Sequence, residues 1–336
     1  MRRLIGLQYL RGLAALGVVA YHAADRSGTH FPLGKAGVDL FFVLSGFLMW
    51  AITDERSRPG PFLSDRIQRI VPCYWIVTSV MLGGALLGLF PAVRLTGWHV
   101  MASYLLLPAI SPSNGQVWPL LVPGWTLEYE LAFYLLFAMV LLLPRRLQLG
   151  TLSALLLGLA IAHAWIPGQQ TMLRFYTDAH ILEFLAGLWL AAGWQRGWLG
   201  DPRAASLLAG LAVMLLAAIR VIWPGAPDVA AYGPSAGLIV AAMLARESGD
   251  KDVPDIRLAR LLGDASYSIY LWHTLAISVT LKLGDRLHIP AAMAIPLHFA
   301  AGTAIGLLGY RLLERPIMLF LRRPKYRHGA PVPGGV

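Results

Sequence analysis

Residues 36–53 have the sequence AGVDLFFVLSGFLMWAIT, in which Asp39 is the only charged side chain. A helix rises about 1.5 Å per residue, so this stretch is nearly as long as the hydrocarbon core of a bilayer is thick. A shorter apolar run, 100–110, predicts one short re-entrant or interfacial helix. The sequence therefore predicts an all-α polytopic membrane protein, a bundle of about ten transmembrane helices. The predicted spans are approximately 5–24, 36–53, 70–91, 124–143, 149–166, 174–193, 203–223, 229–247, 261–283 and 290–313.

The composition excludes the soluble classes. The chain of 336 residues is 57% hydrophobic and 14% charged, and its mean hydropathy is +0.60. A soluble domain carries about 25% charged residues, and disordered chains are polar and poor in aromatic residues. Cys73 is the only cysteine, which excludes a disulfide scaffold and a cysteine-rich metal site. We expect residues 1–327 to form one integral-membrane domain and residues 328–336 a disordered cytoplasmic tail.

The net charge of +10 is explained by topology. Of the Lys and Arg side chains in the connections between predicted spans, twenty fall on one side and seven on the other. Because cytoplasmic loops are enriched in Lys and Arg, this asymmetry predicts that both termini are cytoplasmic. It also predicts contacts with membrane lipids and gives no reason to expect nucleic acid as a partner.

Ionisable side chains inside the predicted spans are candidates for function, because burying them in a membrane is costly. Arg11 and His22 lie eleven residues apart in the first span, about 16 Å along a helix. Asp39 lies near the outer start of the next, antiparallel span, at a depth similar to that of His22. A carboxylate can fix the tautomer of an imidazole that acts as a general base. The alternative is an interfacial histidine that only hydrogen-bonds a carbonyl group.

Two further spans carry ionisable candidates. Glu128 and Glu130 are about 200° apart on a helix, so at most one of them shares the bundle interior with His22. For Glu128 we favour an interfacial, solvated carboxylate. His273 lies past the midpoint of the ninth predicted span, where it could serve either packing or a site.

Arg66 and Arg69 are spaced i, i+3 at the predicted start of the third span, so both guanidinium groups lie on one helix face. At a helix N-terminus such a pair suits a phosphate or pyrophosphate, although simple anchoring to anionic headgroups is the alternative. Asp178, His180 and Glu183 fall within two turns of the sixth predicted span, and we expect them to line an outward cavity. Their spacing lacks the tighter constellation that a metal requires, so no metal site is predicted.

Six segments together resemble the membrane acyltransferase 3 family, particularly its exopolysaccharide-modifying branch. The signature of that family is an arginine followed eleven residues later by a histidine, here Arg11 and His22. Trp125-Thr126-Leu127 stands where many relatives have Trp-Ser-Leu, which is a conservative departure. The matching segments are LRGLAALGVVAYH (10–22), GKAGVDLFFVLSGFLM (34–49), FLSDRIQRIVPCYW (62–75), WTLEYELAFYLLF (125–137), LGDASYSIYLWH (262–273) and LLERP (312–316).

The resemblance implies an O-acyltransferase with ten spans that uses acyl-CoA, most often acetyl-CoA in such relatives, as its cytoplasmic donor. By position it makes His22 the catalytic residue and Arg11 a required one, and it implies no metal. The remaining candidates also fall on positions characteristic of the family. Our assignment is therefore His22, Asp39 and Glu130 as catalytic residues, and Arg11, Arg66, Arg69 and His273 as residues that bind the acyl-CoA.

Geometry and resemblance together predict transfer across the membrane. Arg66 and Arg69 are expected inside and His22 towards the outside, so acyl-CoA would bind from the cytoplasm. A hydroxyl group of a surface glycan, exopolysaccharide or lipid-linked glycan would then arrive at the outer side of a bacterial inner membrane. Direct transfer and an acyl-enzyme intermediate both stay open, as does the oligomeric state. The alternative function is a transporter or flippase for a lipid-linked or amphipathic solute, although we find no internal repeat.

Overall fold

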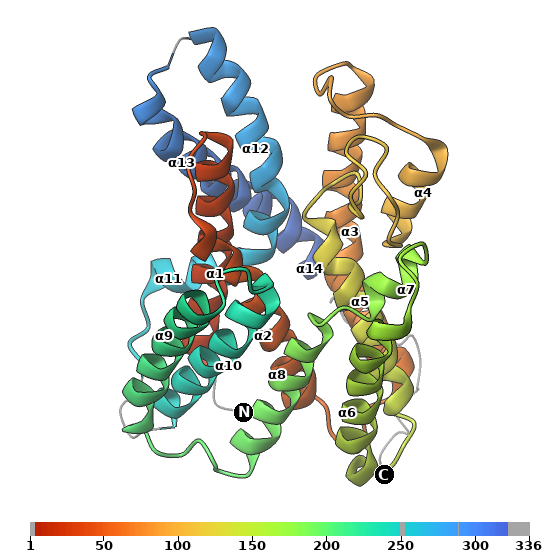
Figure 1. Ribbon diagram of the computed structural model, residues 1–336, viewed down its shortest axis with the longest axis vertical. Helices are drawn as coiled ribbons and strands as arrows, with labels where there is room; N and C mark the ends of the chain where they lie inside the picture. The colour runs from red at the N-terminus through yellow and green to blue at the C-terminus, as the bar shows by residue number, and fades with distance from the viewer. Residues whose placement is uncertain (1–3, 249–252, 288, 322–336) are drawn as a thin grey trace, which may run out of the picture.

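The computed structural model describes residues 4–248, 253–287 and 289–321, and every regular element in these ranges is helical (Figure 1). This confirms the all-α prediction. The predicted tail, 328–336, lies outside the described residues, as do seven of the twenty cations that set the predicted topology. The elements are α1 (Ile5–Arg26), η1 (Pro32–Lys35), α2 (Ala36–Ile52), α3 (Pro59–Leu86), α4 (Gly97–Leu105), α5 (Gly124–Val140), α6 (Arg145–Ala162), η2 (His163–Trp165), α7 (Thr171–Tyr176), α8 (Ile181–Gln195), α9 (Ala204–Ile222), α10 (Asp228–Glu247), α11 (Arg257–Asp264), α12 (Ser266–Leu287), α13 (Ala291–Gly309), η3 (Tyr310–Glu314) and α14 (Arg315–Leu321).

Six helical segments in the described part of the chain are long and apolar enough to cross a membrane. The predicted count of ten is therefore not confirmed. Two further helices that coincide with predicted spans, α5 and α8, have only 17 and 15 residues. Two others, α1 and α12, have 22 residues each and carry polar groups such as Arg11 and His273. The six segments are Pro32–Ile52, Pro59–Leu86, Arg145–Trp165, Ala204–Ile222, Asp228–Glu247 and Met293–Leu321.

The third predicted span begins too late. The helix starts at Pro59 rather than near residue 70, since proline is well suited to the first helical turn, and it runs for 28 residues to Leu86. Arg66 and Arg69 therefore lie about two turns inside α3. The field of a helix N-terminus fades within its first turn, so it does not add to their charge as the sequence analysis supposed.

The predicted spans 174–193 and 261–283 are each interrupted. The first is divided between α7 and α8, and the Asp178 carboxylate accepts a hydrogen bond from the backbone N–H of His180 in the break (3.1 Å). Short side chains of this kind compete with helical hydrogen bonding, which favours a turn here. Asp178 and Glu183 therefore do not share one helix. Similarly, Ala265 separates α11 from α12.

The single short helix predicted at 100–110 corresponds to α4, which ends at Leu106 in a left-handed conformation (φ 53°). It has counterparts that the sequence analysis missed, because the described residues also include the short helices α7, α11 and α14.

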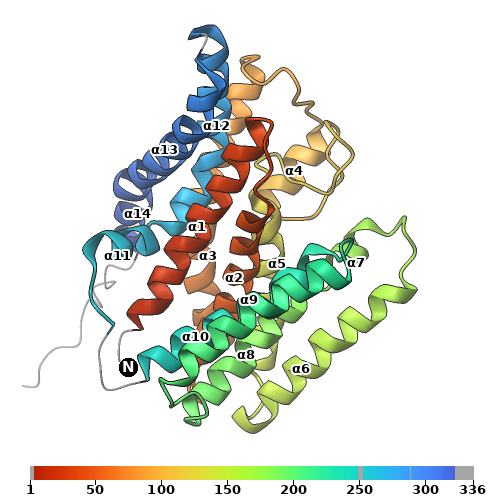
Figure 2. The same ribbon diagram turned by 60° about the vertical axis from the view of Figure 1, so that its left-hand side comes forward.

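Helices distant in the sequence meet along two seams. α12 and α13 lie beside α1 in both views (Figures 1 and 2), while α2 packs against α8 and α10. At the α2–α8 crossing, a Cβ atom on Gly46 would collide with the Phe184 carbonyl oxygen, and one on Gly187 with that of Val43. Small residues permit this close approach, as is common between membrane helices.

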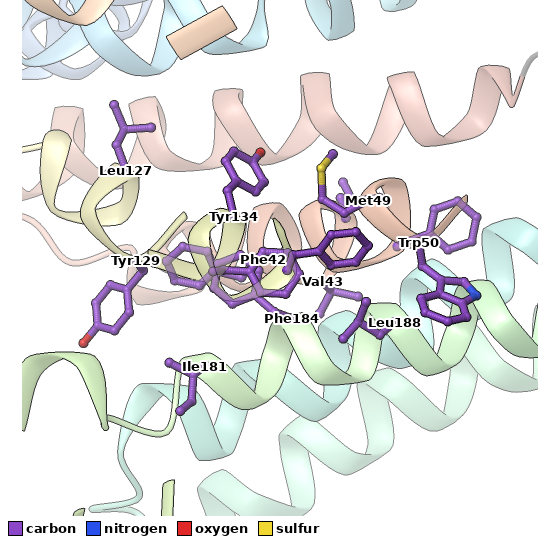
Figure 3. Packing of buried hydrophobic residues seen from close by; sticks show 14 of the residues in the cluster. Phe42, Val43, Met49, Trp50, Leu127, Tyr129, Tyr134, Ile181, Phe184 and Leu188 are labelled. Atoms are coloured by element: carbon purple, nitrogen blue, oxygen red, sulfur yellow. The ribbon is translucent and has the colours of Figure 1, made fainter. Parts of the chain in front are cut away.

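The largest buried cluster draws on most of the helices, and Figure 3 shows the part of it where α2, α5 and α8 pack together. The rings of Phe42 and Phe184 are 4.8 Å apart, and Phe133 stacks on Phe184 at 4.4 Å. This aromatic packing fixes α2 relative to α5, and these two helices carry Asp39 and Glu130.

Candidate active site

Around His22 lies a cavity of about 420 Å³, which we call the histidine cavity. His22 extends from the C-terminal half of α1, and helices α2, α5, α10 and α12 contribute further walls. Both charged and aromatic side chains line it, so a polar ligand with an apolar face would fit. Its walls include Tyr21, His22, Arg26, Lys35, Val38, Asp39, Trp118, Trp125, His180, Asp228, Tyr270 and His273.

His22 and Asp39 line this one cavity, as their predicted depths implied. Within the described residues, however, no hydrogen bond joins them, and the Oδ1 atom of Asp39 has no hydrogen-bond partner there. The Asp39 carboxyl group, 3% exposed, lies instead beside that of Glu183 on α8, which is equally buried and whose oxygens also have no hydrogen-bond partner among the described residues. The predicted carboxylate–imidazole pair is therefore absent from this structure.

His273 also lines the histidine cavity, where its ring centroid lies 5.1 Å from that of His22. The sequence analysis placed His273 with the arginines that bind the donor. The structure places it beside His22, because α12 packs along α1 and presents His273 opposite the last turns of that helix.

A second cavity of about 100 Å³ lies next to the first, and we call it the arginine cavity. All three predicted donor-binding arginines reach it, from α1 and α3, so the fold brings them together. Aromatic and aliphatic residues complete its walls. Its polar lining consists of Arg11, Ser45, Arg66, Arg69, Thr126, Glu130, Tyr134, Tyr267 and Tyr270.

The three guanidinium groups differ in their partners. Arg11 donates two hydrogen bonds to the Ser266 hydroxyl (3.3 and 3.2 Å). Arg69 forms an ion pair with Glu314 on η3 (3.0 Å), a carboxylate that is fully buried. The Nε atom of Arg66 is buried and has no hydrogen-bond partner among the described residues. Arg66 is therefore the arginine with a buried donor left for a ligand.

Glu130 belongs to the arginine cavity rather than to the histidine cavity. Its carboxylate accepts hydrogen bonds from the hydroxyls of Ser45 (2.8 Å) and Tyr134. The sequence assigned Glu130 to catalysis and His273 to donor binding, and the structure reverses these positions. Glu130 lies among the predicted donor ligands, and His273 lies with the predicted base.

Glu128 contradicts its predicted surroundings. We expected an interfacial, solvated carboxylate, but the side chain is completely buried, and neither oxygen has a hydrogen-bond partner in the described part of the chain. The reason is the path of α5, which turns this face inward towards Tyr74 on α3.

A third cavity of about 380 Å³ adjoins the arginine cavity on its other side. We call it the C-terminal cavity, because α11, η3 and α14 supply much of its wall. Arg11 and Arg69 line both it and the arginine cavity, while Val38 and Tyr270 line both the arginine and histidine cavities. The three cavities thus form one row. The C-terminal cavity includes Gln8, Arg11, Arg69, Asp264, Tyr310, Glu314 and Arg315.

One charged residue at the site, Glu314, was not among the residues proposed from the sequence. Glu314 stands in the segment LLERP, which carried the family resemblance, but nothing in the sequence pairs it with Arg69. A π-helical turn over Tyr310–Glu314 brings it there, and such turns occur frequently at functional sites. Of the three residues expected to line one outward cavity, His180 lines the histidine cavity, whereas Asp178 and Glu183 are not among its walls. The Nδ1 atom of His180 lies 2.5 Å from the Asp178 carboxylate. Among the described residues, no three potential metal ligands cluster together.

Comparison with known proteins shows that the chain is similar to acyltransferases. The family model described as an acyltransferase domain matches residues 4–313. The chain is 45% identical to the exopolysaccharide production protein ExoZ of Rhizobium meliloti, over 91% of this chain and 96% of that protein. It is 28% identical to the acyltransferase MdmB of Streptomyces mycarofaciens over 98% and 96% of the two chains. It is 26% identical to the O-acetyltransferase OatA of Staphylococcus aureus over 94% of this chain, but over only 57% of that protein. No solved structure matches the chain.

Proposed function

Because the chain belongs to the acyltransferase 3 family, we propose that it transfers an acyl group from cytoplasmic acyl-CoA to a glycan hydroxyl at the outer side of the membrane. Family membership makes it a membrane acyltransferase of the exopolysaccharide and O-acetyltransferase type. The donor, the acceptor, the base and the direction of transfer are our proposal.

The observation that carries this proposal is the row of three cavities. A donor with an anionic head, a thin arm and a reactive end would use each cavity in turn. The wide C-terminal cavity, about 380 Å³, suits the nucleotide, and the arginine cavity of about 100 Å³ suits the diphosphate and the narrow pantetheine arm that follows it. Arg11 and Arg69 line both of these cavities and Arg66 lines the arginine cavity, so all three would contact the diphosphate. Guanidinium groups bind phosphate oxygens through charge-assisted hydrogen bonds.

The thioester would reach the histidine cavity at the boundary formed by Val38 and Tyr270. There, a ring nitrogen of His22 takes the proton of the acceptor hydroxyl as its oxygen attacks the thioester carbonyl carbon. The tetrahedral intermediate collapses and the bond from carbon to sulfur breaks. The His22 imidazolium returns the proton to the CoA thiolate, so the products are an O-acyl ester and free CoA.

The walls of the histidine cavity support a glycan as the acceptor. Trp118 and Trp125 present indole rings, and both of these line the cavity together with the carboxylate of Asp25. Sugar rings stack on aromatic faces, while carboxylates accept hydrogen bonds from sugar hydroxyls. The relative that is 45% identical is named an exopolysaccharide production protein, which favours a polysaccharide or its lipid-linked precursor. Acetyl is the proposed acyl group, in line with the relative named an O-acetyltransferase.

The charge distribution supports the proposed orientation. With both termini in the cytoplasm of a bacterial cell, α1 carries Arg11 in its inner half and His22 in its outer half. The C-terminal cavity then opens near the cytoplasmic face of the inner membrane, and the histidine cavity opens towards the other.

Two measurements test this function. Purified protein in detergent should release free thiol from acetyl-CoA, because water can enter the histidine cavity as a substitute acceptor. A transporter or flippase, the alternative function, should release none. Mass spectrometry of surface glycans from a deletion strain should show the loss of O-acetyl groups, restored by the wild-type chain. Unaltered glycans together with no thiol release would contradict the proposal.

A further inference from the structure

His22 has an imidazole neighbour whose role none of the foregoing explains. The rings of His22 and His273 are 5.1 Å apart between centroids and inclined by 37°. The His273 side chain is completely buried, whereas His22 is partly exposed to the histidine cavity. An unpaired polar side chain buried this deeply is costly, so its nitrogen atoms must be accounted for.

The tautomer of His273 follows from its backbone contact. The Nδ1 atom lies 2.7 Å from the carbonyl oxygen of Tyr270. A carbonyl oxygen can only accept, so Nδ1 carries the hydrogen and donates it. In the neutral ring the other nitrogen, Nε2, is then an acceptor. Nε2 is buried and has no hydrogen-bond partner among the described residues.

Packing contacts with α13 and with Tyr270 also fix the position of the His273 ring. On α13, a Cβ atom at Gly302 would lie 3.3 Å from Cβ of His273 and 3.0 Å from Val19 on α1. The helices α1, α12 and α13, which lie beside one another in Figure 2, therefore make contact at Gly302. The Tyr270 ring, 5.8 Å from that of His273, covers another side. Together these contacts hold the ring where it faces His22.

We propose that His273 is the positioning residue for His22, and that its Nε2 atom accepts a hydrogen bond from a ring N–H of His22. The inference rests on the proposed function of His22. At a centroid separation of 5.1 Å, facing nitrogens of two imidazole rings come within hydrogen-bonding distance. The hydrogen bond would fix the His22 tautomer, so that its other nitrogen is left without a hydrogen and faces the acceptor hydroxyl. His273 thereby takes the part that a carboxylate plays beside other catalytic histidines.

The proton balance of this arrangement is simple. The acceptor hydroxyl gives its proton to the free nitrogen of His22, which becomes an imidazolium while its second N–H stays bonded to His273. That bond to a charged donor is stronger than a neutral one and stabilises the imidazolium. His22 then returns the proton to the CoA sulfur. His273 neither gains nor loses a proton in the cycle.

The first test compares His273→Leu with His273→Gln in the purified protein, using release of thiol from acetyl-CoA. Mutating a hydrogen-bond partner that orients a functional histidine typically lowers affinity or activity by about 10- to 100-fold. Leucine should lower kcat by about that factor and leave KM for acetyl-CoA unchanged. Glutamine, whose amide oxygen can accept, should recover part of the loss. The control is Ser278→Ala on α12, because the Ser278 hydroxyl bonds only the Thr274 carbonyl of its own helix. Equal kcat in wild type and His273→Leu would overturn the inference.

The second test does not depend on activity. In protein labelled with ¹⁵N-histidine, the two ring nitrogens of His22, assigned with His22→Gln, should show one fixed tautomer. In His273→Leu they should show exchange between tautomers. Unchanged His22 signals in that variant would overturn the pairing whatever the activity. A fixed tautomer in a wild-type protein that releases no thiol would instead contradict the proposed function and leave the pairing supported.

Discussion

The arginine cavity and the histidine cavity share Val38 and Tyr270, yet their polar groups are satisfied differently. In the first, Glu130 accepts from two hydroxyls and Arg69 is paired with Glu314, while the buried Nε donor of Arg66 has no partner among the described residues. In the second, His273 Nε2 has no partner among the described residues, and His22 faces open space. Buried charges must be paired to be stable, whereas an imidazole can stay neutral and available. The first region is therefore built to hold an anion and the second to exchange a proton.

The largest effect should come from His22→Ala, which removes the proposed base. General bases typically contribute about 10²- to 10⁴-fold, so kcat for acyl transfer should fall by that much while protein level and membrane insertion persist. The matched control is His30→Ala, an exposed histidine beyond the end of α1. Glycan O-acylation at the wild-type level in His22→Ala would remove the contrast between the two cavities.

A different kind of loss is expected from Arg69→Met. Removing the cation leaves Glu314 as an uncompensated buried charge, which typically costs about 3–5 kcal/mol of stability. The unfolding midpoint in detergent should drop markedly and recover in the double variant Arg69→Met/Glu314→Gln. An unchanged midpoint in the single variant would mean that this pair does not stabilise the fold.

Arg66→Met should weaken donor binding without this loss of stability. Its Nε atom has no hydrogen-bond partner among the described residues, so a phosphate contact is the interaction to be lost. A hydrogen bond to a charged group is worth about 1.5–3 kcal/mol, which corresponds to about 10- to 150-fold in affinity for CoA. Calorimetric titration of CoA measures it, with Arg56→Met in the exposed loop before α3 as control. Equal affinity for CoA in Arg66→Met and Arg56→Met would mean that Arg66 serves only to anchor the chain to anionic lipid headgroups.

The smallest effect should come from Asp39→Asn. Asp39 interacts with Glu183 and makes no hydrogen bond to His22 within the described residues, so its amide should preserve the packing. A neutral hydrogen bond is worth about 0.5–1.5 kcal/mol, so kcat should change by no more than about tenfold. A loss as large as that of His22→Ala would restore the predicted carboxylate–imidazole pair in place of His273.

Much of the fold could be predicted from sequence because long apolar runs permit little but helices. Runs alone do not show where a helix starts or breaks. Pro59 extends α3 into a polar segment, and Asp178 interrupts an otherwise apolar stretch. Both depend on local hydrogen bonds and backbone geometry that hydropathy does not describe. The predicted count of ten spans is therefore not confirmed, whereas the all-α class is.

At the site, the sequence identified residue types better than partners. The i, i+3 spacing of Arg66 and Arg69 predicted one helix face, because such spacing is a property of a single helix. In the structure both residues line the arginine cavity. Glu130 was predicted beside His22 and His273 beside the arginines, and the structure has the reverse. Their placement depends on how α5 and α12 rotate against α1 and α3, which the sequence does not reveal. Glu314 reaches Arg69 only through a π-helical turn. Contacts between helices distant in sequence have no local signal.

The central claim is that donor and acceptor approach one row of cavities from opposite faces. Sealed vesicles of known orientation test it most directly, with acetyl-CoA and a membrane-impermeant polysaccharide each confined to one side. Transfer should occur only when acetyl-CoA is on the cytoplasmic side and the polysaccharide is on the other. Transfer with both substrates confined to the cytoplasmic side would contradict the account.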